Sequence, residues 1–264
     1  MTVAGPQGSG GDSPGAGPAA DDRPLRVAPP SAPPAPGPAA PAPGPAPALP
    51  PGVAEMTRWL CALETPAGGI SGDFVTGHYH GIPGNQPKLY ANHLAIWEGT
   101  VVPWTAPAIG QVAIDTNNTA GSAVIRELSI GDDSYTVGYG VGEAASDICA
   151  AVTFDADQNT VAARAVELSI NLVEPNSIAV HYRTLAGYRP AKAANWIGLW
   201  RGEASPYDAP DPVARHDITE DVNENDVSLD GLTLVPGANY TLVHFMSALP
   251  TSAAALITFR VAGR

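Results

Sequence analysis

The stretch DFVTGHYHGIPGNQPKLYANHLAIWEGTVVPW, residues 73–104, recurs at residues 176–207 as NSIAVHYRTLAGYRPAKAANWIGLWRGEASPY. The two copies align without a gap at an offset of 103 residues. Nine aligned pairs are identical: His78/His181, Tyr79/Tyr182, Gly84/Gly187, Pro87/Pro190, Ala91/Ala194, Asn92/Asn195, Trp97/Trp200, Gly99/Gly202 and Pro103/Pro206. A period of about 100 residues is too long for a solenoid and fits two tandem small domains. The duplication therefore predicts two homologous domains.

Alternating apolar and polar residues indicate strands in both copies, for example at 166–170 and 177–182. Clusters of Pro, Gly, Asn and Asp interrupt these runs at a spacing of roughly ten residues, as turns between strands do. Residues 56–63 could form a short helix, but they align with the strand-like residues 159–166 and are expected to be a strand. We therefore expect an all-β protein with about seven short strands in each of two tandem homologous β-sandwiches.

The repeat also sets the domain boundaries. Tyr135-Thr136 aligns with Tyr240-Thr241 at an offset of 105, so small insertions separate the matching blocks. We place the first sandwich at residues 53–157 and the second at residues 158–264. Residues 1–52 are rich in Pro, Ala and Gly and lack apolar periodicity, so they are expected to form a disordered tether.

The segment LVPGANYTL, residues 234–242, predicts a turn that is followed by a strand. Pro236-Gly237 makes the turn, and Tyr240 begins the next strand with its hydroxyl returned to nearby backbone. This arrangement resembles the tyrosine corner of a fibronectin type III domain. The first copy has a shorter version without proline at residues 130–135. The resemblance implies a fold of the immunoglobulin or fibronectin III kind.

A second resemblance covers more of the second repeat. The segments IAVHY at 178–182, NWIGLW at 195–200 and ITFRV at 257–261 are similar to SKICH domains. They also resemble the sandwich at the start of plant purple acid phosphatases. Asn195 stands where those families usually carry Asp. The resemblance implies a sandwich used for docking or as an accessory to an enzyme, and it carries over no catalytic residue.

Composition limits the range of partners. The formal net charge is −13 with a pI near 4.6, and no basic stripe is visible, so no nucleic-acid partner is expected. No run approaches the roughly 20 apolar residues of a membrane span, so no membrane insertion is expected. The start of the chain lacks the basic and apolar regions of a signal peptide. We therefore expect a location in the cytoplasm or export by a route without a signal.

The two cysteines leave the redox compartment open. Cys61 and Cys149 both fall in the first repeat, on its expected first and last strands. They form either a disulfide or two buried thiols.

The last strand of each repeated block carries an aromatic face. Leu94 and Ile96, like their counterparts in the second copy, are expected to point into the core. The opposite face presents His93, Trp97, Trp196 and Trp200. Each aromatic ring stands beside a small residue, which indicates close packing over this face. The face either binds a ligand or partner, or is covered by a loop, a neighbouring strand or the sister domain.

A Gly-containing loop follows that strand in each copy and ends in a Pro-aromatic pair. The aromatic residues are Trp104 and Tyr207. Held on a rigid loop, such a residue offers a stacking surface for sugar rings or for side chains of a partner. The alternative is that it folds back as a lid on its own core.

Metal and catalytic motifs are weak or missing. His78 and His80 share a strand face but have no ligand set around them, so no metal and no cofactor is expected. Asp221, Asn223 and Asn225 have the spacing that opens a calcium loop, but the glycine and glutamate of an EF-hand are missing. They form either a loop-type calcium site or a solvated loop. The H-E-x-x-H and G-x-x-x-x-G-K-[ST] motifs are absent.

Together these features predict a non-enzymatic binding or adhesion module with a protein or carbohydrate ligand. Duplication predicts two sites that act together through effective concentration. One alternative is a structural or assembly protein whose aromatic faces form a domain or subunit interface, with self-association. Another is an accessory domain pair of an enzyme, or an enzyme whose site the sequence does not reveal.

Overall fold

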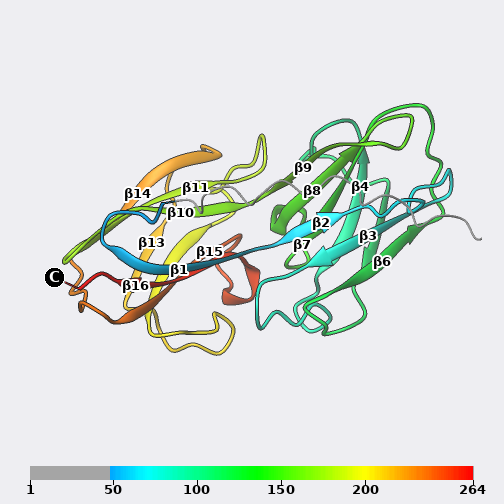
Figure 1. Ribbon diagram of the computed structural model, residues 1–264. Helices are drawn as coiled ribbons and strands as arrows, with labels where there is room; N and C mark the ends of the chain where they lie inside the picture. Colours follow the sequence, from blue (N-terminus) through cyan, green and yellow to red (C-terminus); the bar gives the residue numbers. More distant parts are fainter. Residues whose placement is uncertain (1–47, 264) are drawn as a thin grey trace, which may run out of the picture. The chain divides into compact units, whose positions relative to one another are not determined.

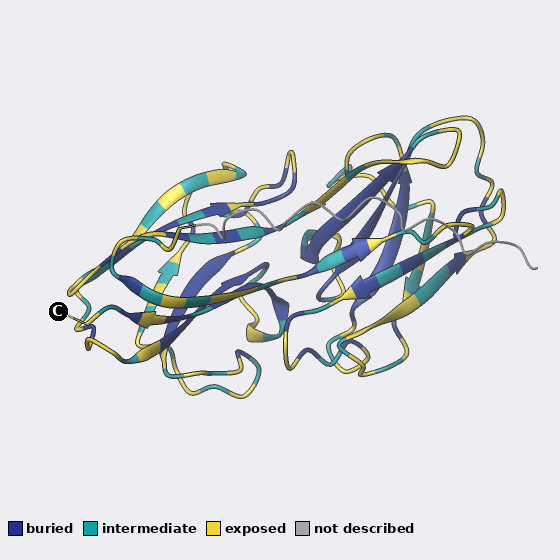
Figure 2. Ribbon diagram, in the orientation of Figure 1, coloured by how far each residue is buried: buried dark blue, intermediate teal, exposed yellow. Residues whose placement is uncertain are grey.

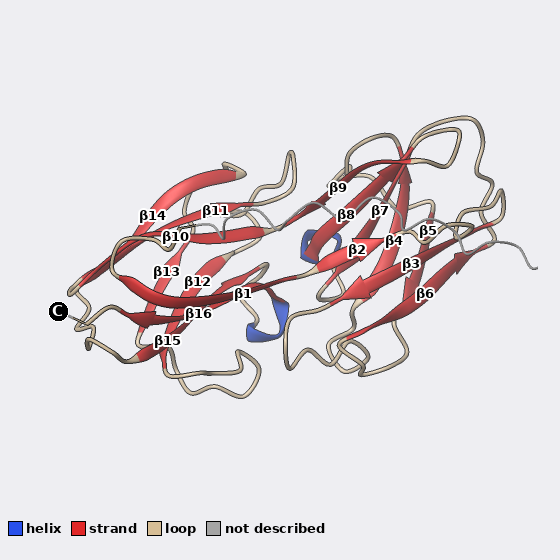
Figure 3. Ribbon diagram, in the orientation of Figure 1, coloured by secondary structure: helices blue, strands red, loops and turns tan. Residues whose placement is uncertain are grey.

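The computed structural model describes residues 48–263, which form sixteen β-strands and two short 3₁₀-helices (Figure 3). Every strand pair is antiparallel. The prediction of an all-β fold is therefore confirmed. The expected tether lies outside the described residues except for residues 48–52. In the described part of the chain, no helix is long and apolar enough to span a bilayer.

The first sandwich contains a three-stranded and a five-stranded sheet. The smaller sheet has the order β2 (Ala62–Glu64), β3 (Phe74–His80), β6 (Ala120–Arg126). The larger has the order β5 (Gly110–Ala113), β4 (His93–Glu98), β7 (Tyr135–Gly140), β8 (Ile148–Phe154), β9 (Thr160–Ala165). The 3₁₀-helix η1 (Ala145–Asp147) precedes β8.

The second sandwich repeats this plan. Its smaller sheet has the order β10 (Glu167–Glu174), β11 (Ser177–Arg183), β14 (Glu224–Asp230). Its larger sheet has the order β1 (Val53–Leu60), β16 (Ala253–Val261), β15 (Asn239–Phe245), β12 (Trp196–Arg201), β13 (Ala214–Asp217). The 3₁₀-helix η2 (Pro250–Ser252) precedes β16, as η1 precedes β8.

The two repeats exchange their first strands. β1 starts the first repeat but pairs with β16 in the second sandwich, with Thr57 opposite Thr258 (Figure 1). β9 starts the second repeat but pairs with β8 in the first sandwich, with Ala163 opposite Val152. After each exchanged strand the chain crosses to its own sandwich, where β2 and β10 pair with β3 and β11. The boundaries at 53–157 and 158–264 divide the sequence repeats, but the sheets cross them.

The segment before β1 is also tied to the second sandwich. The carbonyl of Pro51 accepts a hydrogen bond from the Val173 amide (3.0 Å), and that of Gly52 accepts one from the Ala262 amide (2.9 Å). The described chain is therefore fixed ahead of residue 53, where the sequence predicts the tether to end.

Burial follows the expected alternation in the small sheets and departs from it in the large ones. In β3 and β11 every second residue is buried, because one face of each small sheet meets water (Figure 2). In β7 and β8 every residue is buried. The central strands of the large sheets are therefore covered on both faces, by the small sheet on one face and by loops on the other. The edge strands β1, β5, β9 and β13 keep exposed residues.

Both expected tyrosine corners form a hydrogen bond to the backbone. The hydroxyl of Tyr240 accepts the amide N–H of Val235 (3.1 Å), and that of Tyr135 accepts the amide N–H of Gly131 (2.9 Å). Each bond joins the start of a central strand to the turn before it.

Candidate ligand-binding site

Four of the six aromatic and histidine candidates are inaccessible to a ligand. His93, Trp97, Trp196 and Trp200 expose only 3–4 % of their surface. Trp97 packs with Val102, Ile148 and Leu185, the last from the second repeat. The reading of these strands as a ligand-binding face is therefore wrong, and the alternative of a face covered by loops and the sister repeat is correct.

The second copy of this face is covered by its own aromatic residues. Trp196 stacks on Phe245 with ring centroids 3.9 Å apart, and the indole N–H of Trp200 donates to the Pro210 carbonyl (2.7 Å). A Cβ atom added to Gly198 would lie 2.5 Å from the Trp200 ring. The small residue beside each tryptophan therefore makes room for the ring itself, not for a ligand.

His93 has a structural role. Its Nδ1–H donates to the Gly142 carbonyl (2.7 Å), and burial lowers the pKa of the imidazole. The ring is therefore neutral near pH 7 and holds the end of β7 to β4.

The two Pro-aromatic loops dock on the opposite repeat. The indole N–H of Trp104 donates to the Ala186 carbonyl (2.9 Å), and its ring meets Tyr188 edge-on at 4.7 Å. Tyr207 stacks on Tyr90, with ring centroids 5.0 Å apart and planes 14° apart. Trp104 and Tyr207 are both half-buried. The two side chains are thus neither fully exposed stacking residues nor lids on the core of their own repeat.

A repeated glycine receives each of these aromatic rings. Gly84 and Gly187 have positive φ angles of 88° and 73°. A Cβ atom at Gly84 would lie 3.1 Å from the Tyr207 ring, and one at Gly187 would lie 3.5 Å from the Trp104 ring. The identity of this glycine in both copies follows from the turn and from the close approach of the ring.

An open pocket of about 230 Å³ lies beside Trp104. It is lined by Trp104, Thr105, Ser146, Tyr188, Arg189, Lys192 and Ala193. The Tyr188 hydroxyl forms part of a buried network, 2.8 Å from the Ser146 carbonyl and 2.9 Å from the Asn195 amide nitrogen. Burial raises the pKa of this hydroxyl. The aromatic walls of the pocket are therefore fixed before any ligand arrives.

The equivalent position in the other repeat is already filled. The offset of 103 aligns Trp104 with Tyr207 and Ala193 with Tyr90. Over Tyr207 the space is taken by the stacked ring of Tyr90. Over Trp104 the methyl group of Ala193 leaves the space open. The two positions are thus structurally equivalent: the one over Tyr207 is occupied by Tyr90, and the one over Trp104 is empty.

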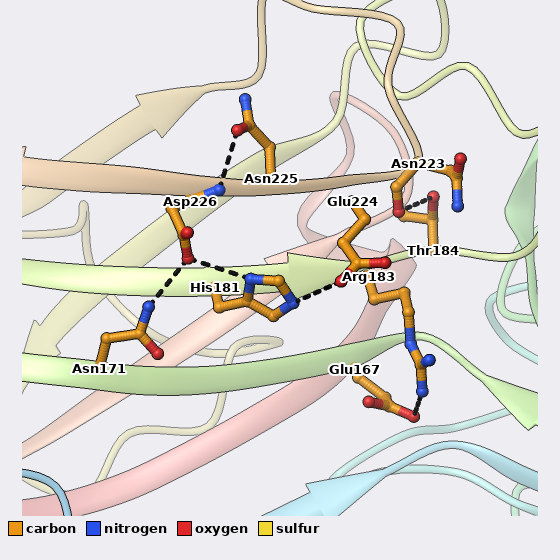
Figure 4. A network of polar contacts seen from close by, with 9 residues as sticks. All are labelled: Glu167, Asn171, His181, Arg183, Thr184, Asn223, Glu224, Asn225 and Asp226. Atoms are coloured by element: carbon orange, nitrogen blue, oxygen red, sulfur yellow. Dashed lines mark hydrogen bonds and ion pairs between the residues drawn. The ribbon is translucent and has the colours of Figure 1, made fainter.

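A larger polar cleft of about 560 Å³ lies where β2, β9 and the end of β11 meet. It is lined by Ala62, Leu63, Glu64, Ala163, Arg164, Ala165, Glu167, Arg183, Thr184, Leu185, Ala186, Asn223 and Glu224. Figure 4 shows the polar network at its edge, in which Arg183 pairs with Glu167. The lining charges are exposed, and exposed ion pairs of this kind contribute little to stability.

His181 belongs to the same network. Its Nδ1 lies 3.0 Å from Asp226, and its Nε2 lies 3.3 Å from Glu224 (Figure 4). Asp226 also accepts a hydrogen bond from the Asn171 amide (2.8 Å). Both imidazole nitrogens therefore face carboxylates on the open surface of the small sheet.

The three candidates for a calcium loop face different partners. Asp221 accepts the backbone N–H of Lys192 (2.9 Å), and the Asn225 amide donates to Glu220 (3.3 Å). The Asn223 carbonyl accepts the Thr184 N–H (2.7 Å). Among the described residues, no group of three or more His, Cys, Asp or Glu side chains could hold a metal ion. The three candidates thus have separate partners, and the calcium site stays a prediction.

The two cysteines are free and buried, which confirms the reading as thiols. Burial, and then a hydrogen bond with Cys61, raises the pKa of the Cys149 thiol well above its usual range.

The hydroxyl of Tyr207 is also buried. Burial raises its pKa, and the two nearby thiols add to this increase. That hydroxyl has no hydrogen-bond partner among the described residues. Tyr207 is held by the stacked ring of Tyr90 from the first repeat, whereas Trp104 has an open pocket beside it.

Comparison of the chain with protein-family models and with curated proteins found no match. The site is therefore interpreted from its geometry alone.

Sequence reasoning identified Trp104 but not the other walls of its pocket. Tyr188, Arg189, Lys192 and Ala193 lie in the stretch that separates the matched strands. The signal was present in the aligned copies, where Ala193 stands opposite Tyr90. The exchange of a large ring in one copy for a methyl group in the other indicates that space is left open in the second copy.

Proposed function

We propose that the protein is a non-enzymatic binding module that holds a ring of a protein or carbohydrate ligand against Trp104. One observation carries the proposal: the twin position over Tyr207 is filled by Tyr90, and the position over Trp104 is open. Tyr90 on Tyr207 thus shows, within the same molecule, how a ring occupies this kind of position.

Preorganisation supports this function. Trp104 is held by its bond to Ala186 and by Tyr188, so neither aromatic residue needs to be ordered on binding. Avoiding such ordering saves about 0.5–1.5 kcal/mol for each side chain. A cavity of roughly 150 Å³ holds benzene, so a pocket of about 230 Å³ has room for a substituted ring.

The proposal places one site in each chain, where the duplication alone predicts two. The Pro-aromatic loop of the second repeat is used for internal packing with Tyr90. Avidity then requires several chains on one ligand, not two sites on one chain.

The test is to fill the pocket with Ala193→Tyr, which gives the second repeat the residue found at the twin position. Binding of N-acetyl-tyrosinamide and methyl glucoside is followed by ligand-observed NMR. We expect one or both neutral ring compounds to bind the wild type and Ala193→Tyr to abolish the binding while keeping the melting temperature.

Leu89→Tyr is the matched control. It adds a ring to the equivalent turn of the first repeat, where Leu89 is 65 % exposed and lies outside the pocket. Binding should be unchanged in this variant. Equal binding to the wild type and to Ala193→Tyr would contradict the proposed site.

A structural role is the second candidate function. It is favoured by the burial of Trp97 against Leu185 of the other repeat, which uses one aromatic face as an interface within the chain. A protein with this role alone would bind no ring compound. Its self-association would show as a concentration-dependent mass in analytical ultracentrifugation.

A further inference from the structure

We propose that the ligand of the Trp104 pocket is an aromatic ring that carries a carboxylate. This inference rests on the proposed function and adds the chemical class of the ligand. It follows from the residues that differ between the open pocket and its filled twin.

The ring half of the ligand is indicated by Tyr90. Its phenol ring lies nearly parallel to Tyr207, at the distance expected for offset aromatic stacking. Trp104 stands at the position of Tyr207 and offers a larger aromatic surface. The occupant that the fold already accommodates at this position is therefore a planar aromatic ring.

The carboxylate of the ligand is indicated by three residues that differ between the two positions. Around the filled position the chain has Gln86, Leu89 and Asp208, and at the aligned positions of the open pocket it has Arg189, Lys192 and Thr105. The filled position thus carries one negative charge. Burial raises the pKa of Tyr90, and this charge adds to the increase. The open position has lost that charge and gained two cations and one carboxylate, Asp221, whose counterpart in the first repeat is the neutral Asn117. Its net charge is therefore positive. In a chain of net charge −13 this local reversal of sign favours an anion.

The cations are only partly neutralised by the protein. Arg189 lies 3.5 Å from Asp221, and this carboxylate also accepts the backbone N–H of Lys192. The Lys192 ammonium has no ion-pair partner among residues 48–263, and Lys192 is one of only two lysines in the chain. Arg and Lys side chains are donors without acceptors. They suit a carboxylate better than a neutral sugar hydroxyl, which also needs an acceptor.

Four compounds separate the parts of the inference. N-acetyl-tyrosine has ring and carboxylate and represents the C-terminal residue of a polypeptide. 4-Hydroxyphenylacetate has both and represents a free aryl acid. N-acetyl-tyrosinamide has the ring only, and N-acetyl-alanine has the carboxylate only. Dissociation constants for the full-length protein are measured by NMR titration at low salt.

We expect both ring acids to bind about three- to tenfold more tightly than the amide, as two partly exposed charge contacts allow. The difference should shrink at about 0.5 M salt because exposed charges are screened. The variant Arg189→Gln/Lys192→Leu takes the residues of the twin position. It should lose the preference for acids, so that the ring acids and N-acetyl-tyrosinamide bind this variant with equal affinity. Tighter binding of N-acetyl-tyrosine would indicate the C-terminal residue of a polypeptide as the ligand, and tighter binding of 4-hydroxyphenylacetate would indicate a free aryl acid.

Each failure has a separate meaning. Equal binding of acid and amide would overturn the inference and leave the proposed function standing. N-acetyl-alanine binding as tightly as N-acetyl-tyrosine would overturn the need for a ring. If no ring compound binds the wild type, the proposed function fails and the inference fails with it. A second charge variant, Lys192→Glu, should reverse the preference, and an unchanged preference there would also overturn the inference.

Discussion

At the scale of single residues, the identities shared by the two repeats mark hydrogen bonds that fix the loops. The Thr136 hydroxyl donates to the Gly99 carbonyl, and the Thr241 hydroxyl donates to the Gly202 carbonyl, each at 2.8 Å. Both glycines have positive φ angles. The same pair of residues therefore holds the start of each Pro-aromatic loop.

The tyrosine corners give the first prediction. Tyr240→Phe leaves the Val235 N–H without its acceptor, and Tyr135→Phe does the same for Gly131. These amides are only partly buried and can reach water, so each variant should lose about 1 kcal/mol of unfolding free energy. Denaturant midpoints measure the loss. Midpoints equal to the wild type would show that the corners do not stabilise the fold.

His244 gives a prediction for pH dependence. It is fully buried, its Nε2 donates to the Asn195 side-chain oxygen (3.1 Å), and burial lowers its pKa to about 3. A folded-state pKa below the unfolded value of about 6.5 means that stability is complete above pH 6.5 and is lost as pH falls towards 3. Between pH 7 and pH 5 this group alone should remove about 2 kcal/mol.

The control is His244→Gln, which keeps a donor for Asn195 and has no proton to gain. Chemical unfolding of both proteins at pH 7, 6 and 5 should show a smaller decrease for the variant. Parallel decreases would mean that His244 is protonated in the folded state.

At the scale of elements, the Pro-aromatic loops fasten each repeat to the other. Trp104→Ala removes a half-buried ring that contacts Tyr188, and Tyr207→Ala removes the ring stacked on Tyr90. Each should cost about 1–3 kcal/mol, between the values for surface and for core aromatics. Thermal or denaturant unfolding measures the loss. A loss below about 0.5 kcal/mol would mean that the loop does not dock.

Much of the element order was predictable from the sequence, because alternation and turn residues act locally. Residues 56–63 and 177–182 were expected as strands. The first stretch runs through the end of β1 into β2, and the second lies in β11. The aromatic face of β4 and β12 was misread. Alternation shows that Trp97 and Trp200 point away from the core of the sandwich, but it does not show which residues cover them. Covering depends on loops distant in sequence, and local pattern does not encode it.

At the scale of the whole molecule, the exchange of β1 and β9 makes each sandwich depend on both repeats. The described residues fall within one compact unit, in agreement with this dependence. The exchange was not predictable from the sequence, because an edge strand with a given alternation can pair with either copy of a duplicated partner. Only the connection lengths and the docked loops select the partner.

The exchange predicts the behaviour of a cut chain. A site-specific protease sequence inserted in the exposed turn at 155–159, between β8 and β9, gives two fragments that each lack a strand of their own large sheet. After cleavage they should remain together in native size-exclusion chromatography and separate only in strong denaturant. An identical site inserted in the β10–β11 turn at 175–176 is a control for the effect of cutting. Fragments that separate under native conditions would contradict the exchange.

Of the two equivalent positions in the chain, the one over Trp104 is open and the one over Tyr207 is filled by Tyr90. The direct measurement is the number of ring-binding sites per chain, determined by isothermal titration with N-acetyl-tyrosine. We expect one site in the wild type, none in Ala193→Tyr, and two in Tyr90→Ala, where removal of the internal ring opens the position over Tyr207. Two sites in the wild type, or one site in all three proteins, would contradict this expectation.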